Sequence, residues 1–314
     1  MLWLVWRQHR MQALVTAALL LAFGVVLWIH GMGTADLAEG LAPGSDELDN
    51  VVAERFQGMY LFVSWLPVVP VLIGLFWGAP VLAKEFETGT AKLAWTQSVS
   101  PRRWLTSKLG GLGVLVTLGG LALGGMINGW LATFDGASVV NRLADLPLFG
   151  GSGVASAAWW LFAFVLGVAA GTVTRRTLSA MAVTLAAYVV VFMVVASPLL
   201  DFRDMYAEPE QLVQTSASDS LPDGSLIAGS QWLDPAGREL DASAVDTVVD
   251  QKCGSLPSGT DFSPCLFKNG YQEAVYYQPP SRYWRFQWTE AAILLAAAVA
   301  LSGYVVYRTA RRLV

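Results

Sequence analysis

The stretch KEFETGTAKLAWTQSVSPRRWLTSK, residues 84–108, is a short polar loop between two long apolar runs. Gly89 and Thr90 offer a turn and a helix cap, and residues 91–96 could form about two turns of helix lying flat at a membrane surface. Ser100 followed by Pro101 predicts a further helix start, because serine caps helices and proline fits the first helical position. The loop is either a docking element or an ordinary solvated turn.

The apolar runs on both sides of this loop define the class of protein. Of the 314 residues, 54% are hydrophobic and 14% are charged, whereas soluble domains carry about 25% charged residues. Several runs are long enough to cross a bilayer. We therefore predict an all-α polytopic membrane protein with six transmembrane helices. The expected spans are residues 11–29, 58–83, 109–132, 154–173, 178–200 and 288–307.

Two features modify this simple bundle. Residues 1–10 combine tryptophans with Arg7 and Arg10, which is typical of a cytoplasmic interfacial helix, although a frayed basic tail has the same composition. Three prolines (Pro67, Pro70 and Pro80) interrupt the second span, and we expect a kinked helix there. Residues 30–57 and 133–153 are expected to be outer loops.

The distribution of charge orients the spans. With the N-terminus inside, the inner segments hold 12 of the 20 basic residues but only Glu85 and Glu87 of the 24 acidic ones, a net charge of +10. The outer segments hold the other 8 basic and 22 acidic residues, a net charge of −14. Because positive charge accumulates on the cytoplasmic side, we predict that both termini, including the tail at 308–314, are cytoplasmic.

A long polar segment, residues 201–287, precedes the last span and is predicted to be extracytoplasmic. It contains both cysteines, Cys253 and Cys265, which have a single possible pairing and lie where a disulfide is permitted. Two unpaired thiols are the alternative. Its scattered aromatic residues either build a small core or rest on the lipid surface; they are Trp232, Phe262, Phe267, Tyr271, Tyr276, Tyr277 and Tyr283.

The sequence lacks the patterns of common catalytic sites. No lysine is followed by Ser or Thr, so a phosphate-binding P-loop is excluded, and His9 and His30 have no partners at zinc-ligand spacing. Glu290 is the one ionisable residue within a span, near its outer end, where we expect it to reach water. We predict no enzyme and no catalytic, cofactor or metal residue in this chain; any ATP and Mg would be bound by a partner.

Residues 78–111 resemble the region between spans two and three of ABC-2 type transporter permeases. The family pattern has a Glu, a Gly-Thr, a Leu, a Thr-x-Pro-like turn and a Lys that enters the third span. The matching residues here are Glu85 or Glu87, Gly89-Thr90, Leu93, Thr96-Gln97-Ser98 and Lys108, and the proline after Thr96 is missing. The opening WLVWRQHR (3–10) and the late YQPPSRYWRFQWTEA (277–291) resemble actinobacterial permeases more narrowly.

This resemblance implies a permease subunit of an ATP-binding cassette transporter in a bacterial cytoplasmic membrane. Two permease subunits, identical or different, would pair, and two ATPase subunits would dock on the inner loops. The expected ATPase-coupling residues are Glu85, Glu87, Gly89, Thr90, Leu93, Trp95 and Thr96. The substrate would be a hydrophobic or amphipathic compound that is exported. A membrane sensor or accessory protein with a ligand-binding external domain and no ATPase is the alternative.

The charge distribution generates a topology test in a background in which both cysteines are replaced by serine. A cysteine at Ser218 should react with an impermeant thiol reagent added to whole cells, and one at Thr174 should not, because the first lies in the predicted outer segment. The background without cysteine is the control. Labelling at Thr174 but not at Ser218 would reverse the orientation.

Overall fold

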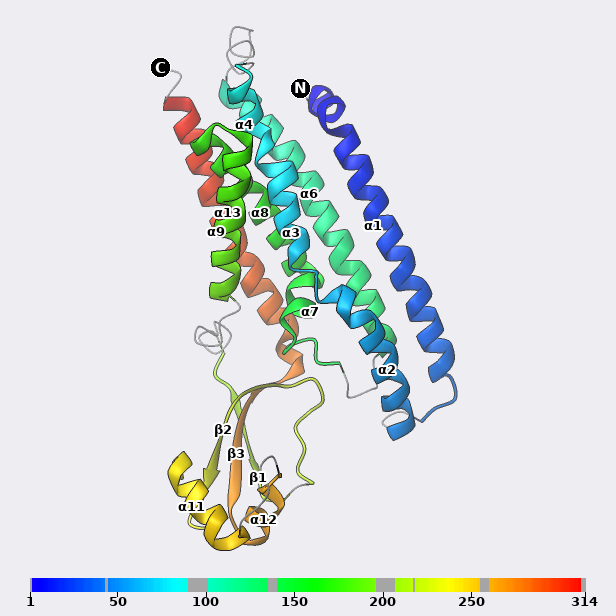
Figure 1. Ribbon diagram of the computed structural model, residues 1–314, viewed down its shortest axis with the longest axis vertical. Coiled ribbons are helices and arrows are strands. Elements are labelled where there is room, and N and C mark those ends of the chain that lie inside the picture. The colour runs from blue at the N-terminus through cyan, green and yellow to red at the C-terminus, as the bar shows by residue number, and fades with distance from the viewer. Residues whose placement is uncertain are drawn as a thin grey trace. The chain divides into compact units, whose positions relative to one another are not determined.

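The computed structural model describes residues 2–42, 45–89, 101–134, 140–195, 207–216, 218–254 and 260–311 (Figure 1). It divides into two compact units. The helical unit contains residues 1–140, 145–200 and 284–314, and the insert domain contains residues 141–144 and 201–283.

The helical unit contains the elements expected of a membrane bundle. They are α1 (Leu2–Ala38), α2 (Asp46–Val63), α3 (Val68–Ile73), the π-helical turn η1 (Gly74–Gly78), α4 (Pro80–Glu87), α6 (Pro101–Leu131), the short 3-10 helix η2 (Ala132–Phe134), α7 (Leu146–Gly151), α8 (Gly153–Thr174), α9 (Thr177–Val195) and α13 (Tyr283–Arg311). Within the described ranges, six helical segments are long and apolar enough to cross a membrane, which confirms the predicted number of spans. The predicted start of a helix at Pro101 is also confirmed.

The second span is broken rather than kinked, because its prolines stand at element boundaries. Residues 64–67 form a turn between α2 and α3, and Pro67 occupies the N-cap of α3. Pro70 lies in the first turn of α3, and Pro80 is the first residue of α4, where a missing N–H costs little. Between them, η1 closes with a hydrogen bond of 2.8 Å from the Ala79 N–H to the Gly74 carbonyl, five residues back.

The predicted outer loop at 30–57 is wrong, since α1 continues to Ala38 and α2 begins at Asp46. The acidic residues that favoured a loop lie in the first turn of α2, where negative charge is favourable next to the helix dipole. The buried residues of α2 recur every three or four positions: Leu48, Val52, Phe56, Met59 and Val63.

The loop expected at 133–153 likewise contains α7, whose N-cap Asp145 accepts a hydrogen bond from the Leu148 N–H at 2.9 Å. At the other end of α1, residues 2–10 continue the first span without a break.

Helix α8 is the central element of the helical unit and contacts α3, η1, α4, α6 and α9 (Figure 1). Most of its length is buried, and glycines bring its backbone next to that of the broken second span. A Cβ atom added at Gly78 would collide with the Phe164 carbonyl oxygen, and one at Gly167 would collide with the Gly74 carbonyl oxygen. Small residues therefore allow the close backbone approach that substitutes for a hydrophobic driving force in lipid.

The insert domain contains a three-stranded antiparallel sheet, which the all-α prediction did not include. The strands β1 (Glu210–Gln214), β2 (Leu226–Leu233) and β3 (Gln272–Gln278) have the order β1-β3-β2. Trp232 of β2 lies opposite Glu273 of β3, and the register shifts between Ile227 and Gly229. Two helices, α11 (Ala242–Cys253) and α12 (Ser263–Lys268), pack against the sheet.

Aromatic side chains form the core of the insert domain. Trp232, Val245 and Leu266 are buried, with Phe262, Phe267 and Tyr271 packed against them. Of the two alternatives that the sequence left open, the core is the one found for four of the seven aromatic residues; Tyr276, Tyr277 and Tyr283 are not part of it. The predicted disulfide between Cys253 and Cys265 is present and joins the end of α11 to α12.

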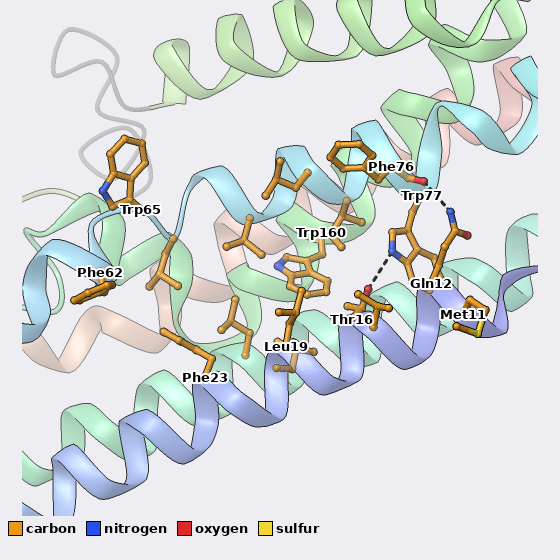
Figure 2. Close-up of a pocket in the computed structure, with 17 residues that line it drawn as sticks. Met11, Gln12, Thr16, Leu19, Phe23, Phe62, Trp65, Phe76, Trp77 and Trp160 are labelled. Atoms are coloured by element: carbon orange, nitrogen blue, oxygen red, sulfur yellow. Dashed lines mark hydrogen bonds between the residues drawn. The ribbon is translucent and has the colours of Figure 1, made fainter.

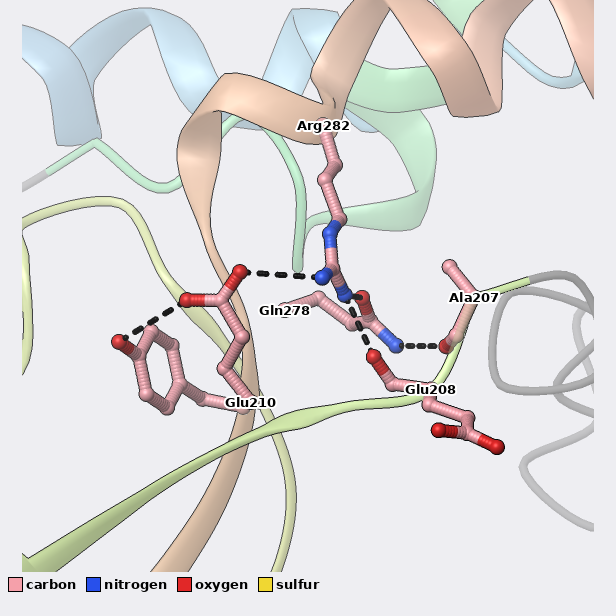
Figure 3. Close-up of polar contacts among 6 residues, drawn as sticks. Ala207, Glu208, Glu210, Gln278 and Arg282 are labelled. Carbon is pink, nitrogen blue, oxygen red and sulfur yellow. Dashed lines mark hydrogen bonds and ion pairs between the residues drawn. The ribbon is translucent and has the colours of Figure 1, made fainter.

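A polar clasp closes the insert domain where its first and last strands meet (Figure 3). One guanidinium nitrogen of Arg282, in η4 (Pro280–Arg282), donates to the Glu208 carbonyl at 2.7 Å and to the Gln278 side-chain carbonyl at 2.6 Å. The other pairs with Glu210 at 3.0 Å. The Gln278 amide donates to the Ala207 carbonyl at 2.7 Å. Residues about 70 positions apart in the sequence are thereby tied together.

Removal of the disulfide should loosen the insert domain, because the bridge closes a short loop in a unit with a small core. Replacing both cysteines by serine should lower its stability by about 3 kcal/mol, the order expected for a loop of this length. Limited proteolysis of the full chain should then cut within residues 226–283 at lower protease concentrations. Cleavage elsewhere in the helical unit is the internal control, and an unchanged pattern would contradict the prediction.

Candidate functional site

Helix α4 carries the described part of the predicted coupling residues and has defined ends. Pro80 begins the helix, and Gly89 follows its C-cap Thr88 with a φ of +72°, a conformation that favours glycine. The Thr88 N–H and hydroxyl both donate to the Lys84 carbonyl, at 2.9 and 2.8 Å. The loop predicted at 84–108 is therefore shorter than expected, since α4 continues to Glu87 and α6 begins at Pro101.

A buried ion pair joins α4 to α6. Lys108 Nζ lies 2.6 Å from Glu85 Oε1, and the exposed fractions of the two side chains are 3% and 15%. Lys108 also donates to the Val81 carbonyl at 3.2 Å and lies 5.3 Å from the centre of the Trp104 ring. Glu85 and Lys108 were predicted to lie at this end of the spans, but the sequence did not show that they bind each other.

A second carboxylate joins α4 to α9. Glu87 accepts hydrogen bonds from the backbone N–H and the hydroxyl of Thr177, at 3.2 and 2.8 Å. Thr177 is the first residue of α9, so Glu87 supplies negative charge at the positive end of that helix. Beside this contact, the guanidinium of Arg175 lies 5.7 Å from the centre of the Phe86 ring.

The structure thus describes three of the predicted coupling residues: Glu85, Glu87 and Gly89. The other four, Thr90, Leu93, Trp95 and Thr96, lie outside the described residues. Glu85 and Glu87 extend from the same short helix to two different neighbours, and the role of all seven residues in coupling stays a prediction.

An apolar pocket of about 690 Å³ lies between α1 and the broken second span (Figure 2). Trp160 of α8 and Leu123 of α6 form its wall on the side of the bundle. Several lining side chains are exposed in the isolated chain, including Leu19 (66%) and Trp65 (65%). The pocket therefore opens on the flank of the helical unit. Its volume is in the range of about 300–1,000 Å³ that is typical of sites for small molecules.

Two hydrogen bonds cross from one side of this pocket to the other, between α1 and η1 (Figure 2). The Gln12 amide donates to the Phe76 carbonyl at 3.2 Å, and the Trp77 indole donates to the Thr16 hydroxyl at 3.2 Å. In a regular α-helix, the Phe76 carbonyl would accept from residue 80, which is a proline without an N–H. Gln12 thus gives this carbonyl a donor from another helix. No local sequence pattern shows this contact, because its partners are 64 residues apart.

Glu290 does not reach water as predicted, since only 5% of it is exposed. It accepts a hydrogen bond of 2.6 Å from the Trp159 indole. One turn earlier, Gln287 is fully buried and binds the Ala155 N–H at 2.9 Å and the Phe149 carbonyl at 2.7 Å. These contacts explain the error: the side chains of α13 turn toward α8 and α7, and a hydropathy profile does not report that direction.

The carboxylates of the insert domain close turns. Hydrogen bonds from the Thr215 N–H and hydroxyl lower the pKa of Asp219, and hydrogen bonds from Ser243 and the Ala244 N–H lower the pKa of Asp241. Among the described residues, no group of three or more His, Cys, Asp or Glu side chains is placed to hold a metal ion. These carboxylates therefore stabilise the local folded structure at pH values above the pKa that they have in the unfolded chain.

Comparison with known families assigns the helical unit. The model of the family described as ABC-2 membrane transporter related matches residues 11–199. The chain belongs to this family. Its members are typically non-catalytic permeases, and such a permease implies an ATPase partner. No curated protein and no solved structure matches the chain.

The buried ion pair generates a prediction about stability. Lys108→Met and Glu85→Gln should each destabilise the chain by about 3 kcal/mol, because each leaves one buried group without its charged partner. Combining the two changes should cost less than the sum of the single changes. Unfolding by dodecyl sulfate in mixed micelles would measure all three variants.

The exposed Lys84 offers a control, since Lys84→Met removes the same charge as Lys108→Met from α4, the helix that carries Glu85, without breaking the pair. It should unfold like the unaltered protein. Strict additivity of the Lys108 and Glu85 variants would show that the two residues stabilise the protein independently.

Proposed function

We propose that this chain is the permease subunit of an ATP-binding cassette transporter that exports a hydrophobic or amphipathic compound. Membership of the ABC-2 membrane transporter related family supports the class. The apolar pocket on the flank of the helical unit supports a substrate that enters from the lipid phase. Power would come from a separate ATPase subunit, because the chain has no P-loop of its own.

The observation that carries the proposal is the connection between the pocket and the predicted coupling loop. Phe76 and Trp77 line the pocket, α4 begins three residues after Trp77, and this helix carries Glu85 and Glu87, the first two of the predicted coupling residues. The eight residues of α4 span about 12 Å. Ion pairing to α6 and capping of α9 make this helix stiff, and a stiff element transmits displacement better than a flexible turn.

The proposed assembly has two ATPase subunits, which bind ATP and Mg, and a second permease that is either identical or homologous. The chain would lie in a bacterial cytoplasmic membrane with both termini in the cytoplasm, as the charge distribution favours. On this orientation, the end of α4 faces the ATPase and the insert domain faces outward. The terminal segments that resemble actinobacterial permeases, residues 3–10 and 277–291, suggest that source.

Co-purification with any P-loop ATPase that a neighbouring gene encodes, followed by assay of ATP hydrolysis in nanodiscs, tests the proposal. Leu93→Asp and Trp95→Asp should each detach or uncouple the ATPase, because apolar and aromatic side chains dominate the energy of interfaces. Stimulation of hydrolysis by a lipophilic compound should fall by about tenfold or more in each variant.

Ile227→Asp is the matched control, since it places the same charge at an exposed apolar position in the insert domain. It should leave ATPase binding unchanged. If both loop variants retain full stimulation, the coupling surface lies elsewhere. If no ATPase binds the unaltered chain, a sensor or accessory role replaces the transport proposal.

A further inference from the structure

We propose that the pocket between α1 and the second span binds a small molecule with an apolar body and one uncharged polar head, and that Gln12 and Thr16 recognise the head. The inference deepens the proposed function, because it names the chemical class of the compound that the permease would carry. It rests on the composition of the pocket and on the hydrogen-bonding capacity that its polar residues retain.

The lining of the pocket excludes a charged head. Aliphatic and aromatic side chains form most of the lining, and none of the 17 lining residues is Asp, Glu, Lys, Arg or His. A charge placed here would lose its hydration without gaining a partner, which costs far more than burying a neutral polar group. The apolar side chains instead favour a long hydrocarbon or fused-ring body.

Gln12 retains one donor and one acceptor site for a head group. Its amide has two N–H groups and a carbonyl oxygen with two lone pairs. The Phe76 carbonyl can only accept, so it takes an N–H, and the Gln12 oxygen faces His9 Nδ1 at 2.7 Å. His9 is therefore the donor in that contact. One amide N–H and one lone pair of Gln12 remain.

Thr16 adds a second donor. The Thr16 hydroxyl accepts from Trp77, and its own proton has no acceptor within the described part of the chain. Trp160, elsewhere in the lining, is 1% exposed, and its indole nitrogen has no hydrogen-bond partner among the described residues. An unsatisfied donor is costly. Gln12 and Thr16 together offer two donors, so the favoured head is a neutral group with an acceptor oxygen, such as a hydroxyl, ester or amide.

The occupant is inferred to be a neutral amphiphile taken from the bilayer. The pocket opens on the flank of the helical unit, where exposed Leu19, Trp65 and Phe76 would face the lipid. A helix from a second copy would fill the apolar part of the groove but would leave the spare donors of Gln12 and Thr16 unused. The polar end of the pocket is therefore the feature that favours a small molecule.

Photolabelling of the full-length chain in phosphatidylcholine nanodiscs, without any ATPase, tests the inference. The probe is a tetradecanol analogue that carries a diazirine at its chain end, and mass spectrometry locates the labelled peptides. We expect labelling within residues 11–23 and 62–77. Tetradecanol should compete at about tenfold lower mole fraction in the bilayer than tetradecanoate, tetradecyltrimethylammonium or tetradecane.

Substitutions in α1 assign the recognition of the head. Gln12→Leu and Thr16→Val should each weaken competition by tetradecanol by about three- to tenfold, the effect of one hydrogen bond, and leave competition by tetradecane unchanged. Thr16→Val is the sharper variant, since it keeps the Gln12–Phe76 hydrogen bond. Gln8→Leu, an exposed glutamine one turn earlier that does not line the pocket, is the matched control.

Three results would overturn the inference: equal competition by tetradecane, stronger competition by either charged compound, or labelling confined to other helices. The last result is the one expected if a second copy fills the groove. Because no ATPase is present, the outcome is independent of coupling. If the chain prefers the neutral head but binds no ATPase, the transport proposal is rejected and the site is kept. If the chain binds an ATPase but shows no preference for the neutral head, the site is rejected and the transport proposal is kept.

Discussion

A backbone carbonyl that loses its helical partner inside a membrane must find another donor, because no water is available there. Two contacts of the broken second span follow from this constraint. Phe76 lies in the π-helical turn before Pro80, and its carbonyl accepts from Gln12 of α1. The Tyr188 hydroxyl of α9 donates to the Pro67 carbonyl at 3.0 Å. The break therefore attracts polar side chains from helices at both sides of the bundle, and it leaves the pocket between α1 and η1.

Helix α4 gains its stiffness from neighbours rather than from its own length. An isolated helix of eight residues is too short to be stable in water. The Lys108–Glu85 pair with α6, the contact of Glu87 with Thr177 of α9 and the packing of Gly171 of α8 against Ala83 hold it on three neighbouring helices. Such a helix moves as part of the bundle. A force applied at its free end would reach the residues that line the pocket.

The insert domain depends on its own core and clasp. Its sheet, the Trp232 core and the Cys253–Cys265 bridge are all formed by residues of the same unit. Arg282 closes it at the point where β3 leads through η4 into α13. Pro279 and the three residues of η4 separate β3 from that helix.

The six spans, the helix start at Pro101 and the one possible disulfide could be predicted from the sequence, because hydrophobicity over about 20 residues, capping chemistry and the number of cysteines can be read without the fold. Which residues meet depends on how the helices pack. The α2 helix, the sheet and the burial of Glu290 were missed, because acidic or polar composition does not reveal which face of an element is covered. Gln12 and Phe76, or Lys108 and Glu85, are brought together by helix packing, and no local pattern records that geometry.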